Sequence, residues 1–155
     1  MNQLIEYREK LVEQLEGAAE EFRSASLDVA DPFKPLEDGE WNTHQLAAHT
    51  RDTETLVYGM RIRRTLEEDN PVFQNFDGET WMAEHYDPDE PLASIVDELT
   101  ASVKSTLTLL KDLPPAAWSR ESRHEVYGGG FTLQTWTERS LGHIREHLET
   151  VKKAA

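Results

Sequence analysis

The sequence predicts an all-α fold, an antiparallel four-helix bundle with a long connection between helices two and three. Four segments repeat apolar residues every three or four positions, and each is long enough for a helix of about 20 residues. No stretch alternates apolar and polar residues as a half-buried strand would. With 155 residues, the chain is the size of one domain that can bury a substantial core. We therefore expect a single domain over residues 1–155.

The first two predicted helices are separated by a loop that contains prolines. The first helix spans about residues 2–26, and Pro32 helps to end it because proline lacks an amide donor. The second begins at Asn42 or Thr43, where Asn42 and Gln45 have the spacing of a capping box, and continues to about Asp69. The apolar stripe expected on the first helix contains Leu4, Leu11, Leu15, Ala18 and Phe22.

The second half of the chain predicts two more long helices. Residues 70–91 are rich in Asp, Glu, Pro and aromatic residues, which favours a long crossover with a short helix near residues 80–85. The third helix is expected at about 91–112 and the fourth at about 132–153, where Thr132 can cap the free amides. These four helices would enclose a core in which facing helices can supply a metal site.

The charge of the chain argues against a nucleic-acid partner. There are 30 acidic and 16 basic residues, and the formal charge of −14 repels a phosphate backbone. Arg61, Arg63 and Arg64 form a basic cluster, which we interpret as a solvated helix end paired with the acidic residues 67–69.

The composition also bears on location and chemistry. The first ten residues lack the pattern of a signal peptide, and no apolar run approaches the roughly 18 residues of a membrane span, so we expect a cytoplasmic protein with no membrane partner. The chain contains no cysteine. Any metal ion would therefore be bound by His, Asp or Glu.

Three histidines have the spacing and phase of a metal site. His143 and His147 are four residues apart on the fourth helix, which places them about 6 Å apart along its axis. His49 is predicted near the middle of the buried face of the second helix. A single buried histidine is more often satisfied by a hydroxyl or a carbonyl group. Three of them on two helices instead predict a divalent-metal site with open coordination positions.

Other polar residues near these histidines are expected in roles other than direct ligation. Asp52 follows His49 by almost one turn and could hydrogen-bond an imidazole or act as a base. Helical phase points Glu54 toward solvent and places Glu146 at the surface. The remaining histidines are expected outside the ligand set: His44, His85 and His124.

The segments 41–54 and 141–148 resemble the DinB/YfiT-like superfamily, and the likeness extends over nearly the whole chain. It includes the glycine-containing loop with His124, although Glu125 stands where the family often has proline. The resemblance implies a four-helix bundle, often a homodimer, and zinc or nickel as the usual ion. It also implies the metal ligands His49, His143 and His147.

The resemblance leaves the reaction open, because the superfamily includes low-molecular-weight thiol transferases and members without an assigned reaction. One hypothesis is a metal-dependent enzyme that activates a thiol or water to transfer or hydrolyse a small-molecule substrate. Its pocket would be lined by Tyr58, Trp118 and Trp136. The alternatives are a non-catalytic bundle with a structural metal ion and a helical interaction protein without metal.

Overall fold

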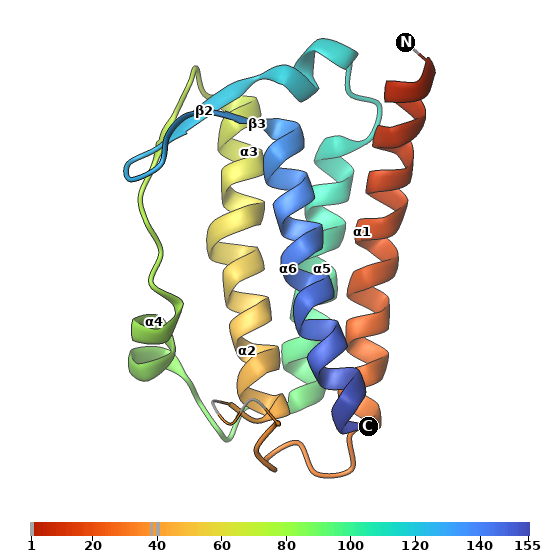
Figure 1. The fold of residues 1–155 in the computed structure, drawn as a ribbon, viewed down its shortest axis with the longest axis vertical. Helices are drawn as coiled ribbons and strands as arrows, with labels where there is room; N and C mark the ends of the chain where they lie inside the picture. Colours follow the sequence, from red (N-terminus) through yellow and green to blue (C-terminus); the bar gives the residue numbers. More distant parts are fainter. Residues whose placement is uncertain (1, 38, 40) are drawn as a thin grey trace.

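The computed structural model describes residues 2–37, 39 and 41–155, and its long helices form a bundle (Figure 1). Met1 and positions 38 and 40 of the predicted first loop lie outside the described residues. The second long helix is continuous, but its middle is π-helical. The long helical elements are α1 (Asn2–Asp28), α2 (Thr43–Thr53), η1 (Glu54–Tyr58), α3 (Gly59–Glu67), α5 (Leu92–Leu110) and α6 (Leu133–Ala154).

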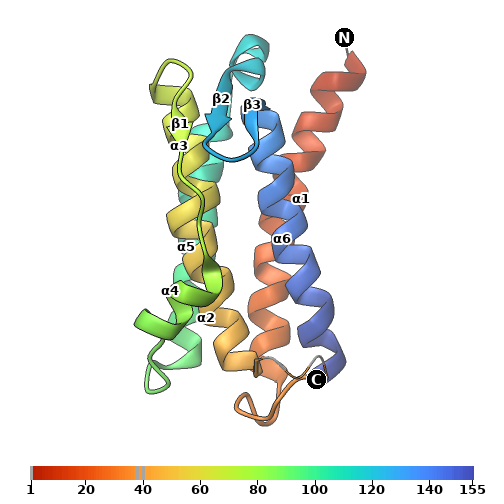
Figure 2. The ribbon, with the colours of Figure 1, turned by 60° about the vertical axis from the view of Figure 1, so that its left-hand side comes forward.

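The bundle is not purely antiparallel, so this part of the prediction is wrong. Helix α1 packs against α5 and α6, and α2 with α3 packs against the same two helices from the other side. Helices α2, α3 and α5 run in one direction, and α1 and α6 run in the other (Figures 1 and 2). The predicted long connection explains this, because it returns along the outside of the bundle before α5 starts. It contains β1 (Val72–Phe73) and α4 (Gly78–His85).

The strictly all-α prediction is also wrong, because the described residues include a three-stranded sheet. Strand β1 pairs in parallel with β2 (Glu121–His124), which pairs antiparallel with β3 (Gly128–Thr132). The sheet lies beside the C-terminal end of α3 and the start of α6 (Figure 2). These strands have only two, four and five residues, and β3 is rich in glycine, so they lack the alternating pattern that identifies a strand in a sequence.

The core is formed mainly by apolar residues of the long helices. Leu4 was expected in the apolar stripe but is 46% exposed, because it lies in the first turn of α1, at the free end of that helix (Figure 2). The 3-10 helix η2 (Pro115–Ser119) places Trp118 in the core at the same end of the bundle. The fully buried side chains include Leu15, Phe22, Ile95, Leu99 and Ile144.

Side-chain caps mark where two of the long helices, α2 and α6, begin. The Asn42 side chain accepts a hydrogen bond from the Gln45 amide at 2.8 Å, and the Gln45 side chain accepts one from the Asn42 amide at 2.9 Å. Thr132 caps α6 through the amide of Thr135 at 3.1 Å. The predicted capping box and cap are confirmed, since both depend on residues that are close in sequence.

The π-helical segment η1 changes which residues of the second long helix face the core. Its widened turn is closed by a hydrogen bond from the Gly59 amide to the Glu54 carbonyl. A Cβ atom at Gly59 would lie 2.8 Å from that carbonyl oxygen, so glycine permits the close approach. Glu54 was expected toward solvent but is completely buried: its amide bonds to the Thr50 carbonyl, so regular α-helical geometry places it beside the buried Thr50. Leu56, inside the widened turn, is 37% exposed.

No helix in the described part of the chain has the length and apolar character needed to cross a bilayer.

Candidate metal centre

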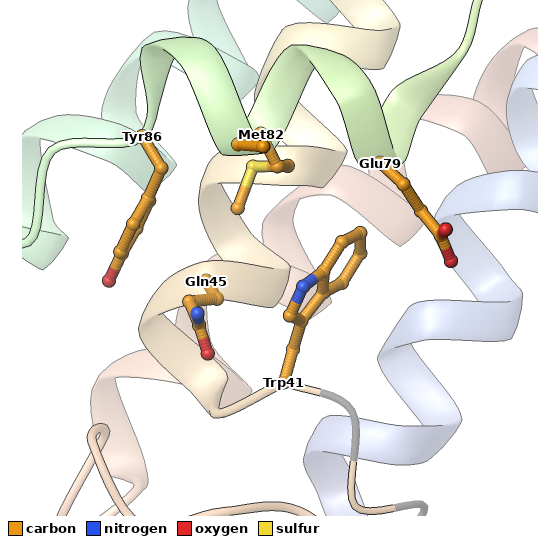
Figure 3. A pocket seen from close by; sticks show the side chains of 6 residues that line it. Trp41, Gln45, Glu79, Met82 and Tyr86 are labelled. Atoms are coloured by element: carbon orange, nitrogen blue, oxygen red, sulfur yellow. The ribbon is translucent and has the colours of Figure 1, made fainter.

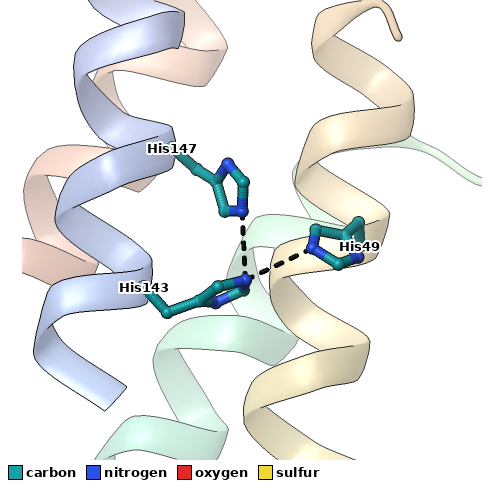
Figure 4. A group of neighbouring side chains, drawn as sticks. All are labelled: His49, His143 and His147. Atoms are coloured by element: carbon teal, nitrogen blue, oxygen red, sulfur yellow. Dashed lines mark hydrogen bonds between the residues drawn. The ribbon is translucent and has the colours of Figure 1, made fainter. Parts of the chain in front are cut away.

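The structure brings the three predicted histidines together between α2 and α6 (Figure 4). The Nε2 atom of His143 lies 3.2 Å from Nε2 of His49 and 3.0 Å from Nε2 of His147. All three available ligand atoms lie within 4.8 Å of one another. An ion bound tetrahedrally at 2.0–2.1 Å separates its nitrogen ligands by about 3.3 Å. The spacing of these nitrogens therefore fits one metal ion, and we call His49, His143 and His147 the histidine triad.

Two of the triad imidazoles are held neutral at physiological pH. Burial, followed by the electrostatic effect of the neighbouring His147, lowers the pKa of His49 to about 4. Burial and the other two imidazoles lower the pKa of His143 to about 3. A histidine must be unprotonated to bind a metal ion, so this environment favours ligation at pH 7.

The surroundings of His49 fix the orientation of its ring. The hydroxyl of Thr53 lies 3.5 Å from Nδ1, and the Trp41 ring contacts the imidazole at 4.8 Å between centroids. A Cβ atom at Gly78 would lie only 3.0 Å from Cε1 of His49. The connection between α3 and α5 therefore passes directly over this histidine. His49 is half-buried under it, rather than in the middle of the core as predicted.

His143 has a different environment. Its Nδ1 atom is buried and has no hydrogen-bond partner among the described residues. Its ring lies 5.6 Å from that of Tyr58, between centroids. The three imidazoles form a donor set that suits zinc, nickel, copper or iron.

The Asp52 carboxylate lies close enough to His49 to affect its pKa, while its hydrogen bonds go to Arg51 and Trp81. One of its carboxylate oxygens accepts from Nε of Arg51 at 3.0 Å, and the other accepts from the Trp81 indole at 3.1 Å. Its charge opposes the lowering of the pKa of His49. Asp52 thus connects α2 to α4, and its role as a base stays a prediction.

The other histidines lie outside the triad. His44 is buried and satisfied on both ring nitrogens, by the Tyr86 hydroxyl at 2.5 Å and the Glu90 carbonyl at 2.6 Å. His85 stacks on Trp81 at the exposed face of α4. Glu146 is exposed, as predicted. His124, in β2, lines a cavity that adjoins the triad.

A cavity of about 220 Å³ adjoins the triad, and we call it the triad cavity. His49 and His143 form part of its wall, and the connection after α3 and the β2–β3 hairpin contribute other parts. Tyr58 and Trp136 line it, as expected for a pocket over the metal. Trp118 does not: it is buried in the core, where the Arg8 guanidinium lies 5.6 Å from its ring.

Two charged residues, Glu54 and Arg61, are buried although the sequence predicts them at the surface. Glu54, predicted at the surface, accepts a hydrogen bond from the Ser140 hydroxyl, whose oxygen is 2.7 Å from both carboxylate oxygens. Burial raises the pKa of Glu54 to about 7, although the Ser140 hydrogen bond opposes this change. In the basic cluster, Arg64 pairs with Glu68 at 2.6 Å as expected, but Arg61 is buried and lines the triad cavity.

A second, larger cavity of about 590 Å³ lies between the start of α2 and helix α4 (Figure 3). Trp41, Gln45, Met82 and Tyr86 line it. No triad histidine belongs to its described lining. Trp41 lines this cavity and also contacts His49, so its ring stands between the larger cavity and the triad.

Comparison with known proteins identifies the family. A family profile described as the DinB superfamily matches residues 3–151. The chain belongs to the DinB superfamily. This match covers every long helix of the bundle and all three triad residues.

Relatives of this DinB-superfamily chain have names that refer to a metal. A protein of Oceanobacillus iheyensis named "Putative metal-dependent hydrolase" is 27% identical over 83% of this chain and 70% of its own length. A protein of Halalkalibacterium halodurans with the same name is 31% identical over 84% of this chain and 75% of its own length.

The fold of this DinB-superfamily chain also resembles a solved structure. YfiT from Bacillus subtilis, described as "a probable metal-dependent hydrolase with an unusual four-helix bundle topology", matches with a TM-score of 0.86. The match covers 96% of this chain and 86% of YfiT at 21% identity. It supports the four-helix-bundle fold.

Proposed function

We propose that this protein binds one divalent metal ion through the histidine triad and uses it to hydrolyse a small-molecule substrate. The observation that carries the proposal is the convergence of three imidazole nitrogens, from helices far apart in sequence, within 4.8 Å of one another. The names of the two relatives, which refer to metal-dependent hydrolysis, support the same reaction class. Zinc and nickel are the ions we propose first, since both accept three imidazole ligands.

The triad cavity favours a catalytic ion over a structural one. Structural sites surround the ion with four protein ligands, whereas catalytic sites keep a position open. Here the described residues supply three histidines, and a cavity adjoins two of them. An ion bound there would polarise a substrate carbonyl group and lower the pKa of a coordinated nucleophile.

The chain's own residues would position the substrate. Aromatic side chains, among them Tyr58 and Trp136, line the cavity and limit the access of water. Burial raises the pKa of Tyr58, so its hydroxyl stays protonated at neutral pH and can donate a hydrogen bond to a substrate. Asp52, connected to α4 through Trp81, is our candidate for a base near the triad.

A thiol-dependent transferase is the second reaction to test, because it would use the same site. The two reactions differ in their need for a co-substrate. Hydrolysis of an activated ester or amide should proceed without added thiol, whereas a transferase should require a low-molecular-weight thiol.

The experiment compares zinc-loaded, nickel-loaded and chelator-treated protein on a panel of aryl esters and amides, with and without thiol. We expect thiol-independent hydrolysis that disappears on chelation and in His143→Ala. The matched control is His85→Ala, which removes an exposed histidine outside the triad and should leave activity unchanged. Full activity in His143→Ala, or turnover that requires thiol, would refute the hydrolase proposal.

A further inference from the structure

We propose that the substrate carries an anionic group, a carboxylate or a phosphate, which binds to Arg61 and Arg139 in the triad cavity. The inference rests on the proposed function for the reacting end of the substrate. The anion site itself is formed by residues outside the triad, so anion binding can be measured with or without metal.

The lining of the triad cavity has the opposite charge to the rest of the protein. The chain has 30 acidic residues and a formal charge of −14. No Asp or Glu is among the described residues that line the cavity, whereas Arg61 and Arg139 both are. A cavity lined by one sign of charge concentrates ligands of the other sign. In this protein such a lining is a local reversal of the overall charge.

Arg61 is a buried cation without an acidic partner in the described part of the chain. Its side chain is 6% exposed, and no carboxylate there lies within ion-pair distance of it. It donates from Nη2 to the Gln74 carbonyl at 2.9 Å, and its buried Nε has no hydrogen-bond partner. The guanidinium lies 4.7 Å from the Trp136 ring. Buried charges are normally paired, so an unpaired donor in a cavity wall indicates a ligand with negative charge.

Arg139 supplies the second cation and relates the anion site to the triad. Its guanidinium lies 5.3 Å from the Phe131 ring, and the described residues include no ion pair to it. It precedes His143 by four residues on α6, a rise of about 6 Å along the helix axis. A small molecule could thus bind the arginines with one end and reach the triad with the other. The Arg61 and Arg139 charges also repel each other, and a bound anion would relieve that repulsion.

A neutral donor adds to the two cations. The Nδ1 atom of His124 accepts hydrogen bonds from the amides of Val126 at 3.1 Å and Tyr127 at 3.2 Å. Neutral His124 therefore carries its proton on Nε2, where it is a donor. The cavity volume of about 220 Å³ is below the roughly 300–1,000 Å³ of sites for drug-sized ligands, so the substrate should be small.

The test uses benzoate, phenylphosphonate and the neutral benzamide as probes, titrated calorimetrically into the protein with zinc and after chelation. We expect saturable binding of at least one anion, with Kd on the order of 1 mM or tighter, and weaker binding of benzamide. If benzoate binds more tightly than phenylphosphonate, the natural group is a carboxylate, and the reverse order indicates a phosphate. Binding of the anion should persist after chelation, because the arginines remain.

Matched arginine variants identify the site. Arg61→Gln and Arg139→Gln should each weaken anion binding on the order of tenfold, the usual effect of losing a charge-assisted hydrogen bond. The controls are Arg63→Gln on α3 and Arg145→Gln on α6, both exposed and outside the described lining of the cavity. These two control variants should bind the anionic probes as tightly as the unaltered protein does. Arg139 is itself exposed, so its variant should fold even if Arg61→Gln does not.

The outcomes separate the anion site from the proposed function. If the unaltered protein binds the anion but no metal, and the arginine variants lose anion binding, the anion site is supported and the hydrolase proposal is refuted. The inference is overturned by the absence of saturable anion binding or by equal binding of benzamide. It is also overturned if anion binding depends on zinc and His143 but is unchanged in both Arg61→Gln and Arg139→Gln.

Discussion

The two sides of the bundle differ in what they bury. Between α1 and α5 the buried side chains are mainly apolar, including Leu15, Phe22 and Leu99, and the helices are regular. Between the second long helix and α6, the structure buries Glu54 with Ser140 and places the histidine triad beside a cavity. The apolar side supplies stability, and the polar side contains the groups that can do chemistry. Functional sites often combine such locally unfavourable features with a stable scaffold.

The π-helical segment lies on the polar side and illustrates the same difference. The widened turn of η1 begins at the buried Glu54. No comparable irregularity interrupts α1 or α5. Substitutions on the two sides should therefore differ in the size and pH dependence of their effects.

The largest loss of stability should follow truncation on the apolar side. Leu99→Ala removes a completely buried side chain of α5 and should lower the free energy of unfolding by about 2–5 kcal/mol. Urea denaturation followed by circular dichroism measures this change. A loss below about 1 kcal/mol would show that this part of the core can relax around the cavity, contrary to our description.

Substitution of Glu54 should have an effect that depends on pH. Burial raises the pKa of this carboxyl from 4.5 to about 7, so ionising it disfavours the native state. The native state loses stability as pH rises from about 4.5 through 7, by up to about 3 kcal/mol. Glu54→Gln removes that loss, so the variant should be the more stable protein above pH 7 by up to this amount.

The comparison requires unfolding curves of both proteins, without metal, between pH 4 and 8. The stability advantage of Glu54→Gln should shrink as pH falls and lose its pH dependence below about 4.5, where Glu54 is protonated in both states. A difference that stays the same across this range would show that Glu54 does not titrate as its burial requires.

Glycine substitutions test the π-helical turn with a smaller expected effect. Gly59→Ala places Cβ at 2.8 Å from the Glu54 carbonyl oxygen and should destabilise the protein by about 1–2 kcal/mol. Gly142→Ala is the matched control on α6, where a Cβ has nothing within 4 Å. It should instead stabilise by roughly 0.5–1 kcal/mol, because alanine has the higher helix propensity. Thermal unfolding distinguishes the two signs. Stabilisation by both substitutions would contradict the role given to Gly59.

Local sequence patterns predicted much of the helical framework. The capping box of Asn42 and Gln45 and the cap at Thr132 lie within three residues of the helix starts they define. The approach of His143 to His147 follows from their spacing on one helix. The position of His49 near this pair could also be predicted, because His49 lies in α2, before the π-helical segment begins at Glu54.

Features that depend on distant segments could not be predicted. Arg61 is buried against Trp136 and Phe73, which belong to other parts of the chain, so its neighbours in sequence gave only the surface interpretation. Glu54 continues the buried face of α2 that includes Ala47 and Thr50, and its partner Ser140 belongs to a distant helix, so no apolar pattern marked Glu54 as buried. The parallel course of α3 and α5 depends on the path of the connection, and no local pattern encodes that path.

The most direct test of the account is the metal stoichiometry of the protein prepared without a His-tag. Elemental analysis after dialysis against zinc or nickel should give about one ion per chain for the unaltered protein and for the control His85→Ala. His49→Ala, His143→Ala and His147→Ala should each lose most of this metal, since each removes one ligand of the triad. An unchanged metal content in all three variants would contradict the central claim that the histidine triad holds the ion.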